Sequence, residues 1–395
     1  MIEEYTVLCD SNIPWHHNRY SKHHIMSRLA RKNRVLFINP QVDVLEFLKS
    51  RQYNPMSLIR RTERPEGESL DVFTPLAVPF RDKFDFVHRI DPVYLVRQIK
   101  RILGVVEREN LVLFLGNPWN VFLLDHFGDC ACSVYHCSDN FPALFEGAFR
   151  DKFEMKEVEM ITRADAVIAV SKTLWAKAAK HNPNSFVVDH GVDEIYFETE
   201  EPAPIPDELG AITGPRIGYV GSISSYLDTS LLEYAMARHR DKNFIYIGPY
   251  DRRGDQERFN ALQTYSNCHY LGKKDWKRLP AYIQHLDVCL VPFLLNEWVS
   301  GVNSLKIKEY LAAGRPVVST FPVGEDLRSA VKVARSKEEF SDLIEVALSE
   351  GRQPSSKETI SRLVKDGGWN SKVEEISNLI LECIKSKRVR GGNPT

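Results

Sequence analysis

The chain has 395 residues, of which 43% are hydrophobic, enough for two ordinary domains with buried cores. Its 52 basic and 53 acidic residues give a net charge of −1, so the charge gives no reason to expect a nucleic-acid partner. The N-terminal residues lack the basic and apolar regions of a signal peptide, and no apolar run approaches the roughly 20 residues of a membrane-spanning helix.

Short apolar, β-branched segments alternate with helix-length amphipathic segments through the first half of the chain. Helices are predicted between most of the strands, as at residues 18–33 and 150–163, and the predicted strands are 5–11, 34–40, 111–117, 132–139, 166–171 and 185–190. This rhythm is typical of a parallel, doubly wound sheet. We therefore expect a first α/β domain over residues 1–197.

A segment rich in Pro and Glu, residues 198–215, interrupts this rhythm and is predicted to be a linker. The alternation then restarts, with strands predicted at 216–223, 243–249, 268–273, 288–293 and 316–320. A second α/β domain is expected over residues 216–370, and residues 371–395 are expected to form a helix that returns to the first domain, and a tail. Two such domains would place a ligand in the cleft between them.

The stretch GVNSLKIKEYLAAGRPVVST, residues 301–320, contains the clearest candidate site. Ser304 stands where the N-cap of a helix belongs, and Gly314 stands just past the end. A helix that begins after a strand presents free N–H groups to an anion, and Lys306 adds a positive charge in its first turn. Glu309 follows five residues after Ser304, roughly 7–8 Å along the axis, which is about the span from a diphosphate to the hydroxyls of the attached ribose. The alternative is a solvated ion pair between Lys306 and Glu309.

A second glycine turn supports an anion site. In GYVGSIS, residues 218–224, Gly221 and Ser222 would let backbone amides approach a phosphate closely. Together the two turns indicate a pocket for a nucleoside diphosphate. The chain has no D-x-D, no Walker A motif and no complete G-x-G-x-x-G followed by an acidic strand end, which argues against a metal-held nucleotide, an NTPase and a dinucleotide oxidoreductase.

The segments IGYVGSIS, NFIYIGP, YLGKKDWKRLPAYIQHLDVCLVPF and NSLKIKEYLAAGRPVVST resemble, in order and spacing, the nucleotide-binding domain of GT-B glycosyltransferases of the family 4-like class. Residues 164–197 resemble the end of the N-terminal domain of these enzymes. The resemblance implies an α/β, GT-B fold, in which two Rossmann-like domains face each other across a cleft. It also implies donor-binding roles for Gly221, Ser222, Lys273, Asn303, Ser304, Lys306 and Glu309.

Two departures from the family pattern bear on the chemistry. Many retaining members carry E-x7-E, but Gly301 stands eight residues before Glu309, so we expect inversion at the anomeric carbon. In addition, Gly221 is followed by Ser-Ile-Ser, without the Arg and Lys that often bind the diphosphate there.

The first domain contains candidates for the acceptor side. Asp139 and His136 lie at or near the end of a predicted strand in SVYHCSDNF, which resembles the xanthan glucuronosyltransferase type, where a strand-end aspartate is the catalytic base. A hydroxyl that attacks an anomeric carbon must lose its proton, and either residue could accept it. Alternatively, Asp139 caps the following segment and His136 is a buried sheet residue. His16, His17 and Arg19 follow the first strand and could contact the acceptor or the diphosphate.

Neither the cysteines nor the histidines form a recognisable metal-site pattern. Cys130, Cys132 and Cys137 cluster without a second CxxC or a His pair at zinc spacing, and the adjacent His23 and His24 cannot share a helix face. We expect no metal and no cofactor, since a nucleotide sugar would be a substrate. Seven cysteines without a paired framework suggest a reducing compartment, so a cytoplasmic protein is expected.

Residues 79–103 mix aromatic, aliphatic and basic side chains. They form either an ordinary amphipathic helix or a surface that touches the anionic inner leaflet, where lipid-linked sugars lie. The leading hypothesis is a metal-independent, hexosyltransferase-type enzyme that moves a sugar from a UDP-sugar to a hydroxyl of a glycan or lipid-linked glycan in surface-polysaccharide synthesis. The alternatives are a non-hydrolysing sugar-nucleotide 2-epimerase and a nucleotide-sugar-binding protein without activity.

Overall fold

The chain divides into two compact units in the computed structural model. The first unit comprises Met1–Asp189, Gly301–Asn303 and Asn370–Thr395, and the second comprises His190–Ser300 and Ser304–Trp369. The residues that the structure describes are 1–16, 19–42, 62–65, 69–77, 87–196, 203–251, 256–301, 304–324, 327–351, 360 and 364–391.

The first unit is built on an eight-stranded sheet with the order β3-β4-β2-β1-β5-β6-β7-β8. The strands are β1 Thr6–Asp10, β2 Arg34–Ile38, β3 Thr62–Glu63, β4 Leu70–Phe73, β5 Leu111–Leu115, β6 Cys132–Cys137, β7 Ala166–Ala169 and β8 Ser185–Val187. All neighbours are parallel except β3 and β4. Because β1 lies between β2 and β5, the strand order reverses there, and such a switch point forms a crevice at the carboxyl ends of the strands.

Helices from both ends of the chain cover this sheet. They are α1 Ser21–Leu29, α4 Val87–Leu103, α5 Leu123–Phe127, α6 Gly147–Arg163, α7 Lys172–Ala178 and the C-terminal α16 Trp369–Gly391. Short 3₁₀ turns follow two of the strands, η2 Pro118–Asn120 after β5 and η3 Phe141–Leu144 after β6.

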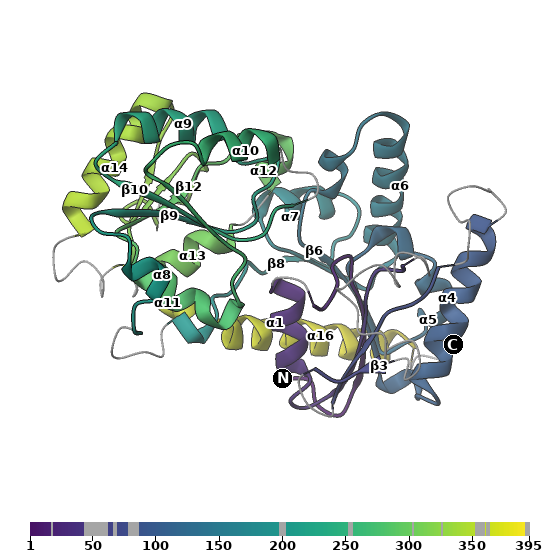
Figure 1. Cartoon of the computed structure of the whole chain (residues 1–395). Coiled ribbons are helices and arrows are strands. Elements are labelled where there is room, and N and C mark those ends of the chain that lie inside the picture. Colours follow the sequence, from purple (N-terminus) through teal and green to yellow (C-terminus); the bar gives the residue numbers. More distant parts are fainter. Residues whose placement is uncertain are drawn as a thin grey trace. The chain divides into compact units, whose positions relative to one another are not determined.

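The helix α16 belongs to the first unit over nearly all of its length. It buries one apolar face, formed by Val373, Ile376, Ile380 and Ile384. It passes beside α1 (Figure 1), where Arg28 Nε donates to Asn370 Oδ1 at 3.0 Å.

The second unit has a six-stranded parallel sheet with the order β11-β10-β9-β12-β13-β14. The strands are β9 Arg216–Val220, β10 Asn243–Ile247, β11 Cys268–Gly272, β12 Val288–Val291, β13 Val317–Ser319 and β14 Val331–Val333. The helices are α8 Asp207–Gly210, α9 Thr229–Arg238, α10 Gln256–Leu262, α11 Leu279–Gln284, α12 Glu297–Gly301, α13 Leu305–Ala312 and α14 Lys337–Gly351. Figure 1 shows α9 and α10 on one side of the sheet and α11 and α13 on the other. The switch point of this sheet lies between β9 and β12.

The unit boundaries differ from the domain limits expected from the sequence. The second unit begins at His190, before the limit expected at residue 197. The segment 198–215, expected to be a linker, contains α8, and Leu209 of this helix is fully buried in the core of the second unit. The few apolar residues of this segment, such as Ile205, Leu209 and Ile212, stand among Pro and Glu without helical periodicity, so its composition concealed its packing.

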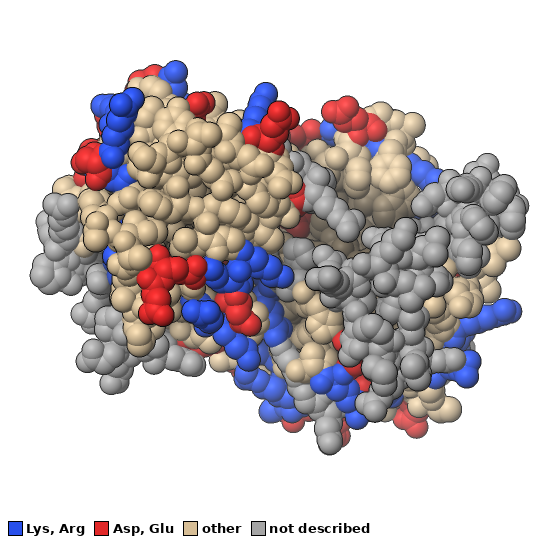
Figure 2. All heavy atoms as spheres, viewed as in Figure 1, with Lys and Arg blue, Asp and Glu red and all other residues tan. Residues whose placement is uncertain are grey.

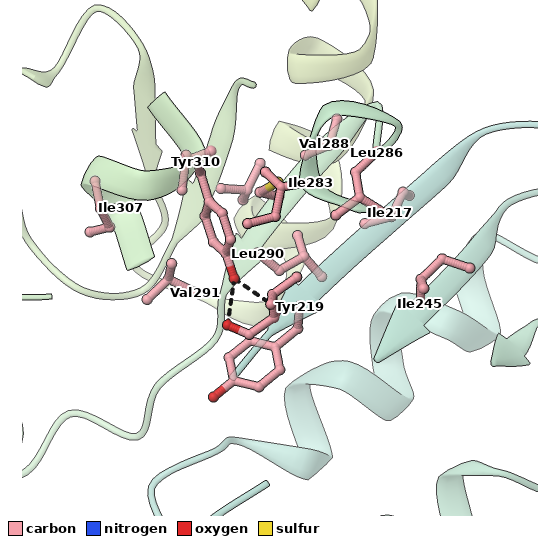
Figure 3. Packing of buried hydrophobic residues seen from close by; sticks show 14 of the residues in the cluster. Ile217, Tyr219, Ile245, Ile283, Leu286, Val288, Leu290, Val291, Ile307 and Tyr310 are labelled. Carbon is pink, nitrogen blue, oxygen red and sulfur yellow. Dashed lines mark hydrogen bonds between the residues drawn. The ribbon is translucent and has the colours of Figure 1, made fainter. Parts of the chain in front are cut away.

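A buried tyrosine joins α13 to β9 in the core of the second unit. The Tyr310 hydroxyl accepts the Val220 N–H at 2.8 Å and donates to the Val220 carbonyl at 3.1 Å (Figure 3). Since a buried hydroxyl that is fully bonded costs little, this pair of bonds fixes the helix at the carboxyl end of the strand.

Charged side chains of both signs lie interspersed over the described surface in the view of Figure 2. None of the helices in the described part of the chain is long and apolar enough to span a bilayer.

Candidate functional site

The first turn of α13 lies at the switch point of the second unit. Ser304 is the N-cap residue, as predicted, and Gly314 follows the helix with φ +69°, a conformation that favours glycine. The Ser304 side chain makes no capping hydrogen bond. The first N–H groups of α13 are therefore not satisfied by this side chain, as an anion site requires.

Lys306 extends from α13 across the end of β9. A Cβ added at Gly221 would lie 2.0 Å from Lys306 Cε and 2.8 Å from Nζ, so only glycine leaves room for this side chain. The Lys306 ammonium lies 5.9 Å from the ring centroid of Tyr219 and 6.0 Å from that of Phe293. Two rings and a glycine thus set the position of the ammonium, and among the described residues no acidic side chain pairs with it.

Glu309 lies one turn further along α13 and is half-buried. Burial raises the pKa of its carboxyl to about 7, while Lys306 lowers it and Asp193 raises it further. The structure records no ion pair between Lys306 and Glu309 within the described residues, so the solvated pair considered from the sequence is not formed. Both side chains remain available to a ligand.

Asp193 is a residue that the sequence analysis did not assign to the site. It is 9% exposed and caps the turn Glu194–Tyr196 by accepting the Ile195 N–H at 3.3 Å. Its charge acts on Glu309. The motif HGVD, residues 190–193, could have drawn attention to Asp193, but the sequence alone does not show that this motif packs beside α13. In the structure Lys308 of α13 donates to the His190 carbonyl at 2.5 Å.

The glycine turn after β9 differs from the expected phosphate turn. The Gly221 N–H donates to the Ile247 carbonyl at 2.8 Å, and the Ile223 N–H donates to the Pro249 carbonyl at 2.9 Å. Among the described residues Gly221, Ser222 and Ile223, only the Ser222 N–H has no backbone hydrogen-bond partner. The Gly221 amide is thus already bonded to β10, and a phosphate contact through the amides of this turn stays a prediction. The role of Gly221 is to make room for Lys306.

The structure gives no further contact at the donor site for the two other predicted donor-binding residues, Lys273 and Asn303, within its described part. Lys273 is exposed directly after β11, and Asn303 lies outside the described residues. A separate hollow of about 600 Å³ near β14, lined by Val331, Arg335, Leu343 and others, contains none of the predicted site residues.

The predicted acceptor-side residues lie in the first unit. Asp139 is half-buried just after β6, and the Ser138 hydroxyl donates to its Oδ2 at 3.3 Å. His136 lies within β6, only 2% exposed, with its ring 5.3 Å from that of Phe114. This placement favours Asp139 over His136 as a group that a substrate could reach.

Side-chain contacts within the first unit hold the loop after β1. His16 Nε2 lies 2.6 Å from Glu63 Oε2, and Arg19 donates to Ser27 Oγ at 3.1 Å. His17 lies outside the described residues. Binding of an acceptor by these three residues stays a prediction.

A group of potential metal ligands occurs in the described part of the first unit, but it differs from the cysteine cluster considered from the sequence. Cys132 Sγ lies 2.8 Å from Cys383 Sγ of α16, and Asp165 completes the group. Lys387 Nζ lies 2.8 Å from Asp165 Oδ2, so a lysine already pairs with this carboxylate.

We expect the variant Gly221→Ala to weaken the binding of a nucleotide sugar. The new Cβ would displace the Lys306 side chain, which removes the cation from the first turn of α13. The expected loss of affinity is about tenfold or more, matching that of Lys306→Met, because a charge-assisted contact is worth about 1.5–3 kcal/mol. Calorimetry on both variants checks this, and a Gly221→Ala protein that binds as tightly as wild type would contradict the steric role.

The raised pKa of Glu309 predicts that the stability of the protein depends on pH. Its pKa is raised in the folded state, so the folded protein binds the proton more tightly than the unfolded chain between pH 4.5 and about 7. The free energy of unfolding should therefore fall as the pH rises through this window. In Glu309→Gln this contribution is absent, so we expect the variant to gain about 1–3 kcal/mol relative to wild type between pH 5 and pH 8. Urea denaturation midpoints at both pH values measure it, and equal slopes for the two proteins would show that the carboxyl is not buried.

Comparisons with known proteins agree with this architecture. Residues 214–350 match the model of the family Glycosyl transferases group 1. Sucrose-phosphate synthase from Thermosynechococcus elongatus is similar with a TM-score of 0.75 and 14% identity, over 97% of this chain and 100% of that one. Alr3699/HepE of Anabaena, solved in complex with UDP and glucose, is similar with a TM-score of 0.70 and 14% identity, over 96% and 100%. The chain has the GT-B glycosyltransferase fold. The fold and the resemblance predicted from the sequence motifs are thereby confirmed.

One curated relative matches this GT-B chain over part of its length. TuaH of Bacillus subtilis (strain 168), a candidate teichuronic acid biosynthesis glycosyltransferase, is 30% identical over 198 residues. The match covers 47% of this chain and 50% of TuaH, so the chain spans about half the length of the curated relative it matches.

Proposed function

We propose that this GT-B protein is a glycosyltransferase that moves a sugar from a UDP-sugar to a hydroxyl of a glycan or lipid-linked glycan during polysaccharide synthesis. The observation that carries the proposal is the arrangement at the switch point of the second unit. There the start of α13, the Lys306 ammonium beside Gly221 and the half-buried Glu309 lie in sequence along one helix.

Each of these groups has a separate role toward the donor. The free N–H groups of α13 and the Lys306 ammonium stabilise the diphosphate as it leaves, since both carry positive charge where negative charge develops. Glu309 accepts hydrogen bonds from the ribose hydroxyls. The complex of Alr3699/HepE with UDP and glucose supports a uridine donor here.

The acceptor hydroxyl loses its proton to Asp139 of the first unit while its oxygen attacks the anomeric carbon. The part assigned to TuaH in teichuronic acid synthesis supports a polysaccharide acceptor. Helix α4 leaves Ile90, Val93 and Tyr94 between 40% and 49% exposed, which supports a contact with the inner leaflet if the acceptor is lipid-linked.

Donor binding tests the proposal directly. We would titrate the protein with UDP-, GDP- and dTDP-sugars in a calorimeter and repeat the titration with Lys306→Met. Lys337→Met is a matched control, because Lys337 is an exposed lysine of the same unit, with its ammonium 4.9 Å from the Tyr234 ring. We expect UDP-sugar binding that Lys306→Met weakens and Lys337→Met leaves unchanged. Binding of no nucleotide sugar at all would refute the proposal.

Activity should not need a divalent ion. Because Lys306 and the helix N–H groups offset the charge of the diphosphate, we expect transfer to continue in the presence of EDTA. Activity that EDTA abolishes and Mg²⁺ or Mn²⁺ restores would show that a metal, and not Lys306, offsets this charge.

One observation favours the epimerase alternative. An epimerase needs carboxylates beside the sugar, and Asp193 and Glu309 are two carboxylates that act on each other. Incubation of the donor without acceptor separates the two functions, because a transferase leaves the sugar's configuration at C2 unchanged. NMR detection of a 2-epimer would favour the epimerase.

A further inference from the structure

Two thiols from distant parts of the chain lie in contact in the first unit. Cys132 begins β6, and its thiol donates to Cys383 Sγ of α16 at 2.8 Å. All seven cysteines of the chain are thiols in the structure. The two sulfur atoms of this pair need to approach by only roughly 0.8 Å more to reach the length of a disulfide bond, about 2.05 Å.

A bridge of hydrogen bonds beside the thiols holds α16 against β6. Asp165 Oδ2 accepts from both the N–H and the hydroxyl of Ser133, the residue after Cys132, at 2.8 Å in each case. The same oxygen accepts from Lys387 Nζ at 2.8 Å, and Lys387 lies about one helical turn after Cys383. Because the neighbours of both thiols are bound to one oxygen atom, the two sulfur atoms are kept close by contacts other than their own.

The two thiols differ in access and in protonation. Cys132 is fully buried, whereas Cys383 is half-buried. The hydrogen bond to Cys383, together with burial, raises the pKa of the Cys132 thiol, so Cys132 keeps its proton and donates it. The same bond stabilises the thiolate form of Cys383, and the thiolate is the nucleophile in sulfur chemistry. Cys383 is thus the sulfur that a molecule from solution meets first, and Cys132 lies behind it.

The contacts favour a bond between the two sulfur atoms over a metal site. Two thiolates on one tetrahedral zinc ion, with Zn–S bonds of about 2.3 Å, lie about 3.8 Å apart. The sulfur atoms here are closer, at 2.8 Å. The third potential ligand, Asp165, already binds the Lys387 ammonium, whose charge opposes that of a metal ion.

We propose that Cys132 and Cys383 are a redox pair, which a low-molecular-weight disulfide oxidises to a disulfide that fastens α16 to β6. The Cys383 thiolate attacks one sulfur of the small disulfide, forms a mixed disulfide and releases a small thiolate. Cys132 then loses its proton to this thiolate, attacks Cys383 Sγ and expels the second small thiolate, which takes up a proton from water. In sum, two protein thiols lose two electrons and two protons, and the small disulfide is reduced to two thiols.

The new bond would respond to the surroundings of the protein. Reducing surroundings keep both thiols reduced, so the bond forms only when the ratio of small disulfide to small thiol rises. It joins residues 251 positions apart, and a cross-link across a long loop restricts the unfolded chain strongly. Oxidation should therefore stabilise the first unit against unfolding. The proposal is independent of the proposed function, because no group assigned to the transfer reaction takes part.

Counting thiols on the full chain tests the proposal. The protein would be incubated with oxidised glutathione or with dithiothreitol, and its thiols would be counted after denaturation. We expect the oxidised protein to lose two of its seven thiols, and dithiothreitol to restore them. Mass spectrometry of the digested protein should find Cys132 joined to Cys383. The oxidised protein should unfold at a temperature roughly 5–10 °C higher than the reduced protein.

Two variants make the result specific. Cys383→Ser, at a half-buried position, should form no cross-link and gain no thermal stability from oxidised glutathione. Cys268→Ser is the matched control and should form the same cross-link as wild type, because Cys268 is also half-buried but lies in the second unit.

Several outcomes would overturn the proposal. They are an unchanged number of thiols in the oxidised wild type, glutathione bound to Cys383 without a cross-link, a cross-link through Cys130, and a cross-linked protein that unfolds at the same temperature as the reduced one. A zinc ion that is bound stoichiometrically by the purified protein and lost in Cys383→Ser would also overturn it, because the thiols would then be metal ligands.

Discussion

Replacement of Asp139 by Asn is expected to lower kcat by about 10²–10⁴-fold, the usual cost of losing a general base. The amide keeps the shape of the carboxyl and can still accept from Ser138, but it cannot take the acceptor's proton. Donor affinity should barely change, because the donor-binding groups lie in the other unit. A loss confined to kcat indicates an interaction made mainly in the transition state. Steady-state kinetics with calorimetry of the donor measure both quantities.

Asp151→Asn is a matched control for this variant, since Asp151 is an exposed carboxylate of the same unit. It should leave kcat unchanged. If Asp139→Asn instead keeps near-normal kcat but unfolds at lower temperature, Asp139 is a structural cap. His136→Ala should then show the kinetic loss, although the burial of His136 in β6 argues against that outcome.

The second large effect is expected for Glu309→Ala, which should weaken UDP-sugar binding roughly 10–150-fold. This corresponds to about 1.5–3 kcal/mol, the worth of hydrogen bonds to a charged group. The variant leaves the start of α13 and Lys306 intact, so it separates the ribose contact from the diphosphate contact. Titration with UDP-sugar and with inorganic diphosphate should show a loss for the first ligand only.

Glu338→Ala, on the exposed first turn of α14, is a control for the loss of one carboxylate in the same unit. It should bind the donor like wild type. Equal affinities for wild type and Glu309→Ala, with both proteins folded, would remove Glu309 from the donor site.

The sequence predicted the regular part of the fold well. Every strand predicted from apolar, β-branched runs is present, as for VCLVPF and CSVYHC, because parallel strands buried on both faces leave a continuous apolar run. The strands β3, β4 and β14 were not predicted. Each contains a charged residue, Glu63, Asp71 or Lys332, which interrupts the apolar run that marked the other strands.

The site was predictable only where its residues share one element. Ser304, Lys306 and Glu309 were recognised because the helix cap and the spacing are local features of the chain. The contacts between elements were not accessible in this way. No pattern in the sequence shows that β10 uses the Gly221 amide, or that Asp193, more than 100 residues before Glu309, acts on that carboxyl.

The place of α16 has a consequence for biosynthesis. The Ile2 N–H donates to Ser377 Oγ, and Cys132 of β6 lies against Cys383. The first unit is therefore completed by residues that are synthesised after the second unit, which lies between His190 and Trp369 and can finish folding earlier. Until α16 is synthesised, the apolar surface that Val373, Ile376, Ile380 and Ile384 cover remains exposed on a nascent chain. Chaperones should accordingly bind mainly to the N-terminal half of the nascent chain. A chain truncated before Asn370 should aggregate rather than give a folded fragment.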